Sequence, residues 1–339
     1  MDTRGTATTH RATTRTTGTA PPGDLVLRTD ALTKRYGDRT AVDGVSMTVR
    51  QGEVYGFLGH NGAGKTTTLR MVLGLVRPTA GRVTVLGRPA GRPAVTARVG
   101  ALVEGPGIYP YLSGRDNLRV LARYQHLPRT EVERVLDLVD LTGRGDDAYK
   151  GYSLGMKQRL GVAAALLGDP ELVILDEPTN GLDPAGMADM RALVVSLARG
   201  GRTVLLSSHL LAEVQEICDR VGIIDHGRLL REARVADLRG SVTVRVRATP
   251  PGTALAVATR LAGPDAVRPL PDGALGVDLP ASAAPDLTRA LVAAGADVHE
   301  VAPTERTLEE VFLEMTTPDP TTTGPITTRP TTTGKESVS

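Results

Sequence analysis

The sequence GHNGAGKT occupies residues 59–66 and fits the pattern G-x-x-x-x-G-K-[ST]. A short apolar run, Val54–Leu58, precedes it with the composition of a strand, and the segment Gly64–Leu75 is typical of a helix. This strand–loop–helix context is the one that the pattern requires. Glycines let backbone N–H groups converge on phosphate oxygens, and the start of a helix adds positive potential. The stretch therefore predicts a phosphate-binding loop.

Two side chains of this loop have distinct expected roles. The Lys65 ammonium is placed to reach the β- and γ-phosphates of a nucleotide, and the Thr66 hydroxyl is placed to ligate Mg²⁺. The residues expected to bind the nucleotide phosphates are Gly59, His60, Asn61, Gly62, Ala63, Gly64, Lys65, Thr66 and Thr67.

A second apolar run, Leu172–Leu175, ends in the two carboxylates Asp176 and Glu177. A buried parallel strand delivers its carboxyl end to the ligand crevice of an α/β sheet. We expect Asp176 to enter the Mg²⁺ shell and Glu177 to activate a water for attack on the γ-phosphate. The alternative, a solvated strand end without a catalytic role, becomes minor beside Lys65.

Strands and helices alternate along most of the chain, which favours an α/β fold with a parallel sheet covered by helices. The expected strands are Leu25–Leu32, Ala41–Val49, Glu53–Leu58, Arg82–Leu86, Leu172–Leu175, Thr203–Leu206 and Val221–Ile224. Besides the helix after the loop, we expect one helix capped by Ser113 with Asp116 in its first turn. The other expected helices are Thr130–Leu141, Ser153–Leu167, Pro184–Ala198 and His209–Cys218.

The pattern changes after Gly240. Residues 241–301 have the order β-α-β-β-α-β of a ferredoxin-like unit, and a last helix is expected at Leu308–Met315. We therefore expect a main domain at 24–236, with a helical subdomain at about 105–168, and an α+β accessory domain at 241–316. The Thr-rich ends, 1–23 and 317–339, lack apolar residues to bury and are expected to be disordered.

Composition excludes several classes of protein. The formal net charge is +2, and the first 23 residues account for it with three arginines against one aspartate. The remaining chain is neutral, which argues against nucleic acid as a partner. The single cysteine, Cys218, excludes an internal disulfide, and no apolar run approaches the roughly 20 residues of a membrane helix. An integral membrane protein, a secreted protein and a disulfide scaffold are thus not expected.

Residues 152–159, YSLGMKQR, resemble the signature motif of ABC-type ATPases, in the form common in exporters of the drug- and peptide-resistance type. Further family motifs follow in order: Tyr36 matches the aromatic that stacks on adenine, Asn180–Asp183 the D-loop, and Ser207–His209 the switch histidine. The resemblance covers about residues 25–235. The ending TLEEVFL at 307–313 also resembles daunorubicin- and bacitracin-resistance ATP-binding subunits.

This resemblance implies a P-loop NTPase core of ABC type, with a parallel sheet core, an antiparallel β subdomain and a helical subdomain. In the family, the signature residues that match Ser153 and Gly155 close on the γ-phosphate held by the other subunit of a head-to-tail homodimer. The D-loop, with Asp183, also belongs to the nucleotide site. Taken alone, Ser153 is an ordinary helix N-cap and would carry little weight.

The family also implies that His209 contacts the γ-phosphate and Glu177, and that Tyr36 stacks on adenine. Taken alone, His209 is more often a helix-start residue than a catalytic one, and Tyr36 is a core residue. The implied cofactors are ATP and Mg²⁺, and the implied partner is a separate integral membrane permease. The chain is then expected at the cytoplasmic face of the membrane, powering export of an antibiotic, peptide or other small molecule.

One position departs from the family pattern. The family usually has glutamine in the loop that senses Mg²⁺ and couples to the membrane subunit, whereas this chain has Glu104. We expect Glu104 to act at the catalytic and metal site, with a changed charge beside Mg²⁺. Leu154 and Met156 also depart from the L-S-G-G-Q form of the signature but leave Ser153 and Gly155 intact.

Five of the seven tyrosines lie between Tyr109 and Tyr152. We hypothesise that Tyr109 and Tyr111 dock a cytoplasmic helix of the permease, and the alternative is that they pack the helical subdomain. Two other functions compete with transport: an ABC ATPase acting on DNA or ribosomes, and a nucleotide sensor without turnover. The 88 residues from Lys65 to Ser153 leave no room for a long coiled-coil arm, and Glu177 with His209 argues against a mere sensor.

Overall fold

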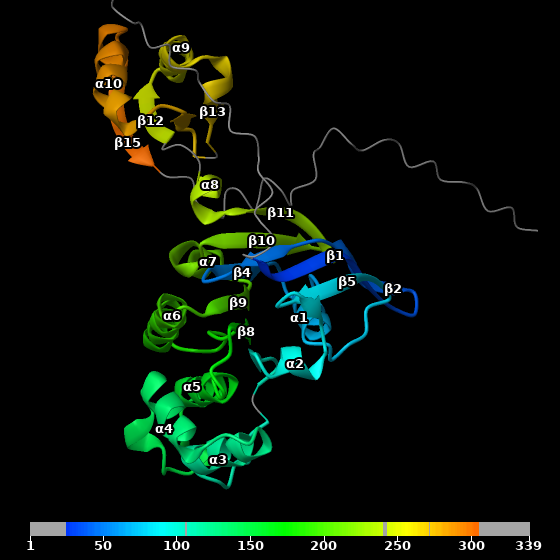
Figure 1. The fold of residues 1–339 in the computed structure, drawn as a ribbon. Helices are drawn as coiled ribbons and strands as arrows, with labels where there is room; N and C mark the ends of the chain where they lie inside the picture. Colours follow the sequence, from blue (N-terminus) through cyan, green and yellow to red (C-terminus); the bar gives the residue numbers. More distant parts are fainter. Residues whose placement is uncertain (1–24, 106, 240–242, 271, 305–339) are drawn as a thin grey trace, which may run out of the picture.

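The computed structural model describes residues 25–105, 107–239, 243–270 and 272–304. Its central sheet has six strands in the order β11-β10-β4-β9-β8-β7 (Figure 1). All neighbours are parallel except β11, which is antiparallel to β10. The parallel core expected from the alternation is therefore confirmed. Its strands are β4 (Val54–Leu58), β7 (Val99–Leu102), β8 (Leu172–Asp176), β9 (Thr203–Ser208), β10 (Arg220–Asp225) and β11 (Arg228–Arg234).

A second, antiparallel sheet has the order β2-β1-β5-β6, with β3 also paired to β1. Its strands are β1 (Leu25–Tyr36), β2 (Arg39–Val45), β3 (Thr48–Arg50), β5 (Ala80–Val85) and β6 (Arg88–Pro89). The prediction of one strand over Ala41–Val49 is wrong, because β2 and β3 are separate. At the break, the Thr29 hydroxyl donates to the Val45 carbonyl and accepts from the Met47 N–H, so one side chain bridges the two sides of the break.

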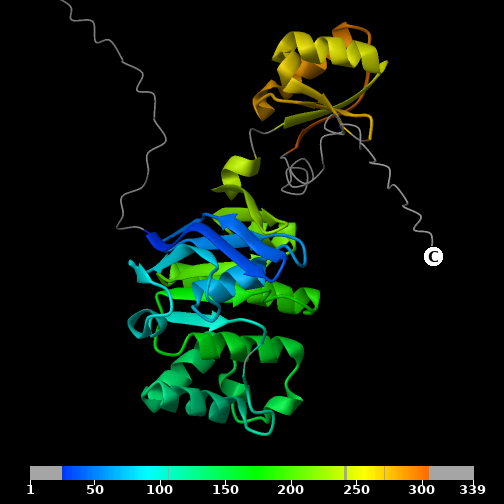
Figure 2. The same cartoon turned by 90° about the vertical axis from the view of Figure 1, so that its right-hand side faces the viewer.

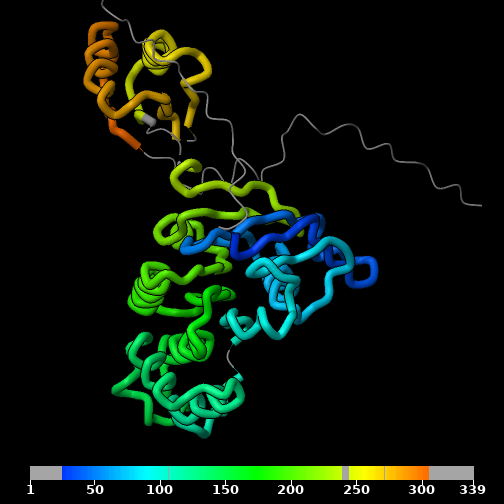
Figure 3. The backbone as a smooth tube through the Cα atoms, viewed as in Figure 1, coloured from blue at the N-terminus to red at the C-terminus, as the bar shows by residue number. Residues whose placement is uncertain are grey.

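The helices of this part are α1 (Lys65–Val72), α2 (Pro93–Thr96), α3 (Gly114–Tyr124), α4 (Arg129–Leu138), α5 (Leu154–Ala165), α6 (Pro184–Arg199), α7 (Leu211–Ile217) and α8 (Val235–Arg239). The predicted cap of α3 is confirmed, since the Ser113 side chain accepts from the Asp116 N–H. Helix α1 ends before the predicted Leu75, and Gly74 then takes a positive φ of 73° that a helix does not have. Figure 3 shows α3, α4 and α5 gathered in one group, and α5 packs against β7.

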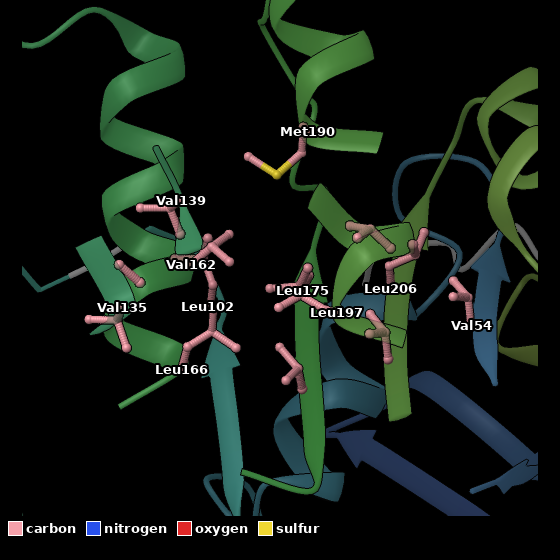
Figure 4. Close-up of a cluster of buried hydrophobic side chains, with 14 of the residues drawn as sticks. Val54, Leu102, Val135, Val139, Val162, Leu166, Leu175, Met190, Leu197 and Leu206 are labelled. Carbon is pink, nitrogen blue, oxygen red and sulfur yellow. The ribbon is translucent and has the colours of Figure 1, made fainter. Parts of the chain in front are cut away.

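The side chains of the central sheet alternate between two hydrophobic cores. One face, with Leu102, Leu175 and Leu206, packs against α3 to α7. The close-up in Figure 4 shows part of this core, including side chains from α4, α5 and α6. The other face, with Phe57, Ile174 and Leu205, packs against α1 and the antiparallel sheet. Figure 2 shows these elements in layers. Because both faces of the central sheet are buried, its inner strands are continuous apolar runs, and such runs can be predicted from the sequence.

The C-terminal part forms a sheet of its own, ordered β13-β14-β12-β15, over a separate apolar cluster. Its elements are β12 (Thr243–Thr249), α9 (Pro251–Ala262), β13 (Val267–Pro269), β14 (Leu275–Val277), α10 (Ala284–Ala293) and β15 (Asp297–Thr304). The predicted order β-α-β-β-α-β is confirmed. The helix predicted at Leu308–Met315 and both Thr-rich ends lie outside the described residues. None of the helices in the described part is both long and apolar enough to cross a membrane.

Candidate functional site

The loop from Gly59 to Gly64 joins β4 to α1 and depends on its glycines. Gly62 and Gly64 have φ of +85° and +107°, a conformation that side chains with a Cβ rarely adopt. A Cβ on Gly64 would lie 2.6 Å from the Ala41 carbonyl oxygen, and one on Gly59 would collide with the Ile224 carbonyl. Helix α1 has no side-chain cap, so its first turn faces the loop with backbone N–H groups. The loop therefore has the backbone of an anion site.

The Lys65 side chain is buried, and its ammonium contacts three oxygen atoms. Its Nζ donates to the carbonyl oxygens of Gly59 (2.7 Å) and His60 (3.2 Å) and lies 3.0 Å from Glu177 Oε1. The ammonium thus connects the predicted phosphate loop to the predicted catalytic carboxylate. An open cavity of about 210 Å³ adjoins these groups. It is lined by Arg39, Ala41, Asn61, Gly62, Gly64, Lys65, Thr66, Thr67 and Glu177.

Asp176 stands at the carboxyl end of β8 beside Thr66. Its Oδ2 accepts from the Thr66 hydroxyl at 2.8 Å, and its Oδ1 accepts from the Ser207 hydroxyl at 2.5 Å. The register of the sheet brings this about, because Asp176 lies opposite Ser207 on β9. Two of the three expected metal ligands, Thr66 and Asp176, therefore meet at one point. Ser207 is a functional candidate that sequence reasoning treated only as part of the switch motif, and its signal was its position at the end of the next strand.

Glu177 follows Asp176 with a φ of +49°, outside the strand. Its backbone N–H donates to Ser207 Oγ at 3.0 Å, and its Oε2 lies 2.5 Å from His209 Nδ1. The helix predicted from His209 to Cys218 begins only at Leu211. The alternative of a helix-start histidine is therefore wrong, and His209 lies in the loop after β9. The structure brings Lys65, Glu177 and His209 together.

The signature residues lie in a different cavity, of about 530 Å³. Ser153 caps α5 by accepting from the Met156 N–H at 3.2 Å, and Asp183 caps α6 by accepting from the Gly186 N–H at 3.0 Å. Ser153, Gly155 and Asp183 all line this cavity, which shares no lining residue with the cavity at Lys65. The two groups of predicted site residues are thus not brought together within one chain.

Two predicted site residues lie at the periphery. Tyr36, at the end of β1, is 48% exposed, so the alternative that it packs in the core is wrong. The Lys34 Nζ sits 4.9 Å from the centre of its ring. Glu104 lies just after β7 with a φ of +59°, and its carboxylate forms an ion pair with Arg70 of α1. This pairing was not foreseen.

Comparison with known proteins agrees with this geometry. The family model described as ABC transporter matches residues 42–180. A daunorubicin resistance ATP-binding protein, DrrA3 of Streptomyces coeruleorubidus, is 38% identical over 87% of this chain and 97% of its own length. The chain belongs to the family of ABC transporter ATP-binding subunits. The bacitracin transport ATP-binding protein BcrA of Bacillus licheniformis is 46% identical over 61% of this ABC subunit and 69% of its own chain.

Solved structures place this ABC subunit in the same fold. CbiO1 of Clostridium perfringens, part of an ABC transporter complex, superimposes with a TM-score of 0.58 at 27% identity, over 63% of this chain and 90% of its own. As a member of the family, the ABC subunit binds and hydrolyses ATP and works with a membrane permease.

Proposed function

We propose that this ATPase powers export of an antibiotic, a peptide or another small molecule through a separate permease. The names of its relatives support this cargo class: they are bacitracin, daunorubicin and lantibiotic transport or resistance proteins. The observation that carries the catalytic part is the contact of Glu177 with both Lys65 and His209. A carboxylate held this way at the end of a parallel strand suits a general base.

Mg²⁺ fits the site beside Thr66. Magnesium prefers hard oxygen ligands and keeps substrate phosphates in its shell. The Thr66 hydroxyl and the Asp176 carboxylate supply two such oxygens 2.8 Å apart. Within the residues that the structure describes, no group of three or more His, Cys, Asp or Glu is arranged to hold a metal alone. Thr66 and Asp176 would therefore hold the ion, which when bound would neutralise the charge that develops on the nucleotide phosphates.

Each residue of the site then has its own role in the hydrolysis of ATP to ADP and phosphate. The loop amides and Lys65 bind the β- and γ-phosphates, which draw the ammonium away from Glu177. Glu177 takes a proton from the attacking water, and His209 keeps the carboxylate oriented through Nδ1. Thr67 and Asn61 line the phosphate cavity, and the half-exposed Tyr36 offers its ring to the adenine.

A head-to-tail homodimer would complete each site. Ser153 and Gly155 lie in a cavity separate from that at Lys65, and the α5 N-terminus favours anions. We infer that this second site binds the γ-phosphate held by a second copy, with Asp183 beside it. Such closure traps two nucleotides, and phosphate release reopens the dimer to move the permease.

ATP-dependent dimerisation of the Glu177→Gln variant, measured by light scattering, tests this assembly. In that background, Ser153→Asp keeps a residue able to cap α5 but adds a negative charge where the γ-phosphate should bind. We expect it to abolish the dimer. Ser153→Asn has nearly the same shape and also caps a helix, but it is neutral, so it should dimerise. Equal dimerisation of the Asp and Asn variants would contradict the shared site.

The proposed permease contact involves Tyr109 and Tyr111. Their side chains are 44% and 72% exposed, and their ring centres lie 5.9 Å apart. The Asn117 amide fixes Tyr109 by bonding both its N–H and its carbonyl. In contrast, Tyr152 is buried, so packing of the helical subdomain explains that residue.

Recovery with the cognate permease in a pull-down tests this contact. The double change of Tyr109 and Tyr111 to Ala should reduce recovery. Tyr124→Ala serves as the matched control, because Tyr124 is a 79% exposed tyrosine at the end of α3. Unchanged recovery of the double variant would count against docking.

The rest of the assignment follows from this role. We propose residues 24–236 as the nucleotide-binding domain, with a helical subdomain at about 105–168, and residues 241–316 as an accessory domain. Contact with the permease would keep the ATPase at the cytoplasmic face of the membrane. The DNA- or ribosome-acting alternative is not favoured, because α3 and α4 have only 11 and 10 residues and form no long arm.

A further inference from the structure

Arg70 and Glu104 form an ion pair beside the proposed metal site. Arg70 lies in the last turn of α1, the helix that begins with the phosphate loop, and Glu104 follows β7. Strands β7 and β8 are parallel with Leu102 opposite Leu175. Glu104 therefore leaves the sheet at the same edge as Asp176 and Glu177. The ion pair thus connects α1 with the segment that follows β7, the outermost strand of the sheet.

The surroundings of Arg70 connect it to the nucleotide site. The hydrogen bond with Glu104 raises the pKa of the Arg70 guanidinium, and the charges of Glu104 and Asp176 act in the same direction. Arg70 is thus within electrostatic reach of the carboxylate expected to bind Mg²⁺. The φ of +59° at Glu104 and of +92° at Gly105 turn the chain sharply at this point. The turn directs the carboxylate toward α1, where Arg70 meets it.

We propose that Arg70 is a positioning residue that holds the Glu104 carboxylate against α1 and out of the metal shell. The inference rests on the proposed Mg²⁺ site at Thr66 and Asp176. An unpaired carboxylate at this edge would be a competent magnesium ligand and would add a negative charge beside the phosphates. The positive charge of Arg70 balances the negative charge of Glu104, so the segment after β7 carries no net charge at this point, as it would with an amide side chain.

Manganese binding to the ATP complex measures this role without relying on turnover. Mn²⁺ serves as the probe, the Glu177→Gln variant as the non-hydrolysing background, and electron paramagnetic resonance counts free Mn²⁺. Arg70→Ala should free Glu104 and tighten Mn²⁺ binding about tenfold, the lower end of the range for changes around metal ligands. In a protein that also carries Glu104→Gln, Arg70→Ala should change the Mn²⁺ affinity less than about threefold. No carboxylate is freed there, and only the repulsion between the arginine and the metal ion is lost. Arg70→Lys retains a charged partner and should restore the reference affinity.

Arg98→Ala is the matched control. Arg98 pairs with Glu171 at 2.5 Å, just before β7 and β8, at the opposite end of the same two strands. The Arg98→Ala variant should therefore bind Mn²⁺ with unchanged affinity. Equal shifts for Arg70→Ala with and without the Glu104→Gln change would overturn the positioning role, and so would no shift in either case. If Mn²⁺ does not bind the reference ATP complex at all, the proposed metal site fails, and this inference fails with it.

Discussion

His209 Nδ1 lies 2.5 Å from Glu177 Oε2, and the other oxygen of the same carboxylate lies 3.0 Å from Lys65 Nζ. Three chain segments meet at this carboxylate: the phosphate loop, the end of β8 and the loop after β9. The register of the parallel strands sets the meeting point, because Asp176 pairs with Ser207. His209 thus fixes one oxygen of Glu177 while Lys65 meets the other, and the histidine contact favours a preorganised base once the phosphates draw Lys65 away.

Replacement of the switch histidine should slow hydrolysis. His209→Ala removes the group that orients Glu177, so we expect the rate of ATP hydrolysis to fall about 10²-fold or more while ATP affinity is largely retained. Phosphate release and equilibrium nucleotide binding measure the two quantities. His226→Ala is the control, because His226 is 94% exposed in the β10–β11 turn. A rate unchanged in His209→Ala would remove the histidine from the proposed mechanism.

Arg220 should matter for stability. Its guanidinium lies 3.3 Å from Glu53 Oε1 and 3.2 Å from Glu232 Oε1, and all three side chains are largely buried. Arg220→Met would remove the cation that pairs with both buried carboxylates, and we expect the free energy of unfolding in urea to fall by about 3–5 kcal/mol.

Acidic pH should lessen this loss. Burial already raises the pKa of Glu53, and without Arg220 the folded state would bind the proton more tightly than the unfolded state. The stability of the variant should therefore fall as the pH rises through the raised pKa. Arg28→Met, which breaks an exposed pair with Asp30, should cost less than about 1 kcal/mol. Comparable losses for Arg220 and Arg28 would contradict this prediction.

Cys218 should be unreactive in the folded protein. Burial raises the pKa of its thiol well above the usual range, and a Cβ on Gly56 would lie 2.9 Å from its Sγ, which shows how closely β4 packs on it. A disulfide reagent such as DTNB should therefore react only after unfolding in urea. Leu75→Cys places a thiol at a 69% exposed position as a positive control. Rapid labelling of native Cys218 would contradict the packing of this core.

The sequence predicted the central strands β4, β8, β9 and β10 because burial on both faces makes them continuous apolar runs. It missed β7, which is four residues long at the sheet edge, and β11, whose segment RLLREAR is mostly charged and lies partly in solvent. Such strands owe their structure to pairing with neighbours and carry little local signal.

In the site, too, residues within contiguous motifs were predictable, whereas contacts between distant segments were not. Contiguous motifs predicted Lys65, Thr66, Asp176 and Glu177 at the ends of strands. Long-range pairs were beyond sequence reasoning: Ser207 with Asp176, and Arg70 with Glu104. These contacts depend on sheet register and on where α1 ends, which no single segment specifies.

Steady-state phosphate release by the Glu177→Gln variant, measured beside its ATP affinity, tests the central claim most directly. The amide keeps the shape of the side chain but cannot accept the proton, so turnover should fall about 10²–10⁴-fold while ATP binding persists. Glu171→Gln, at the opposite end of β8, should hydrolyse ATP at the normal rate. Turnover of Glu177→Gln equal to that of the unaltered protein would contradict the assignment of Glu177 as the general base.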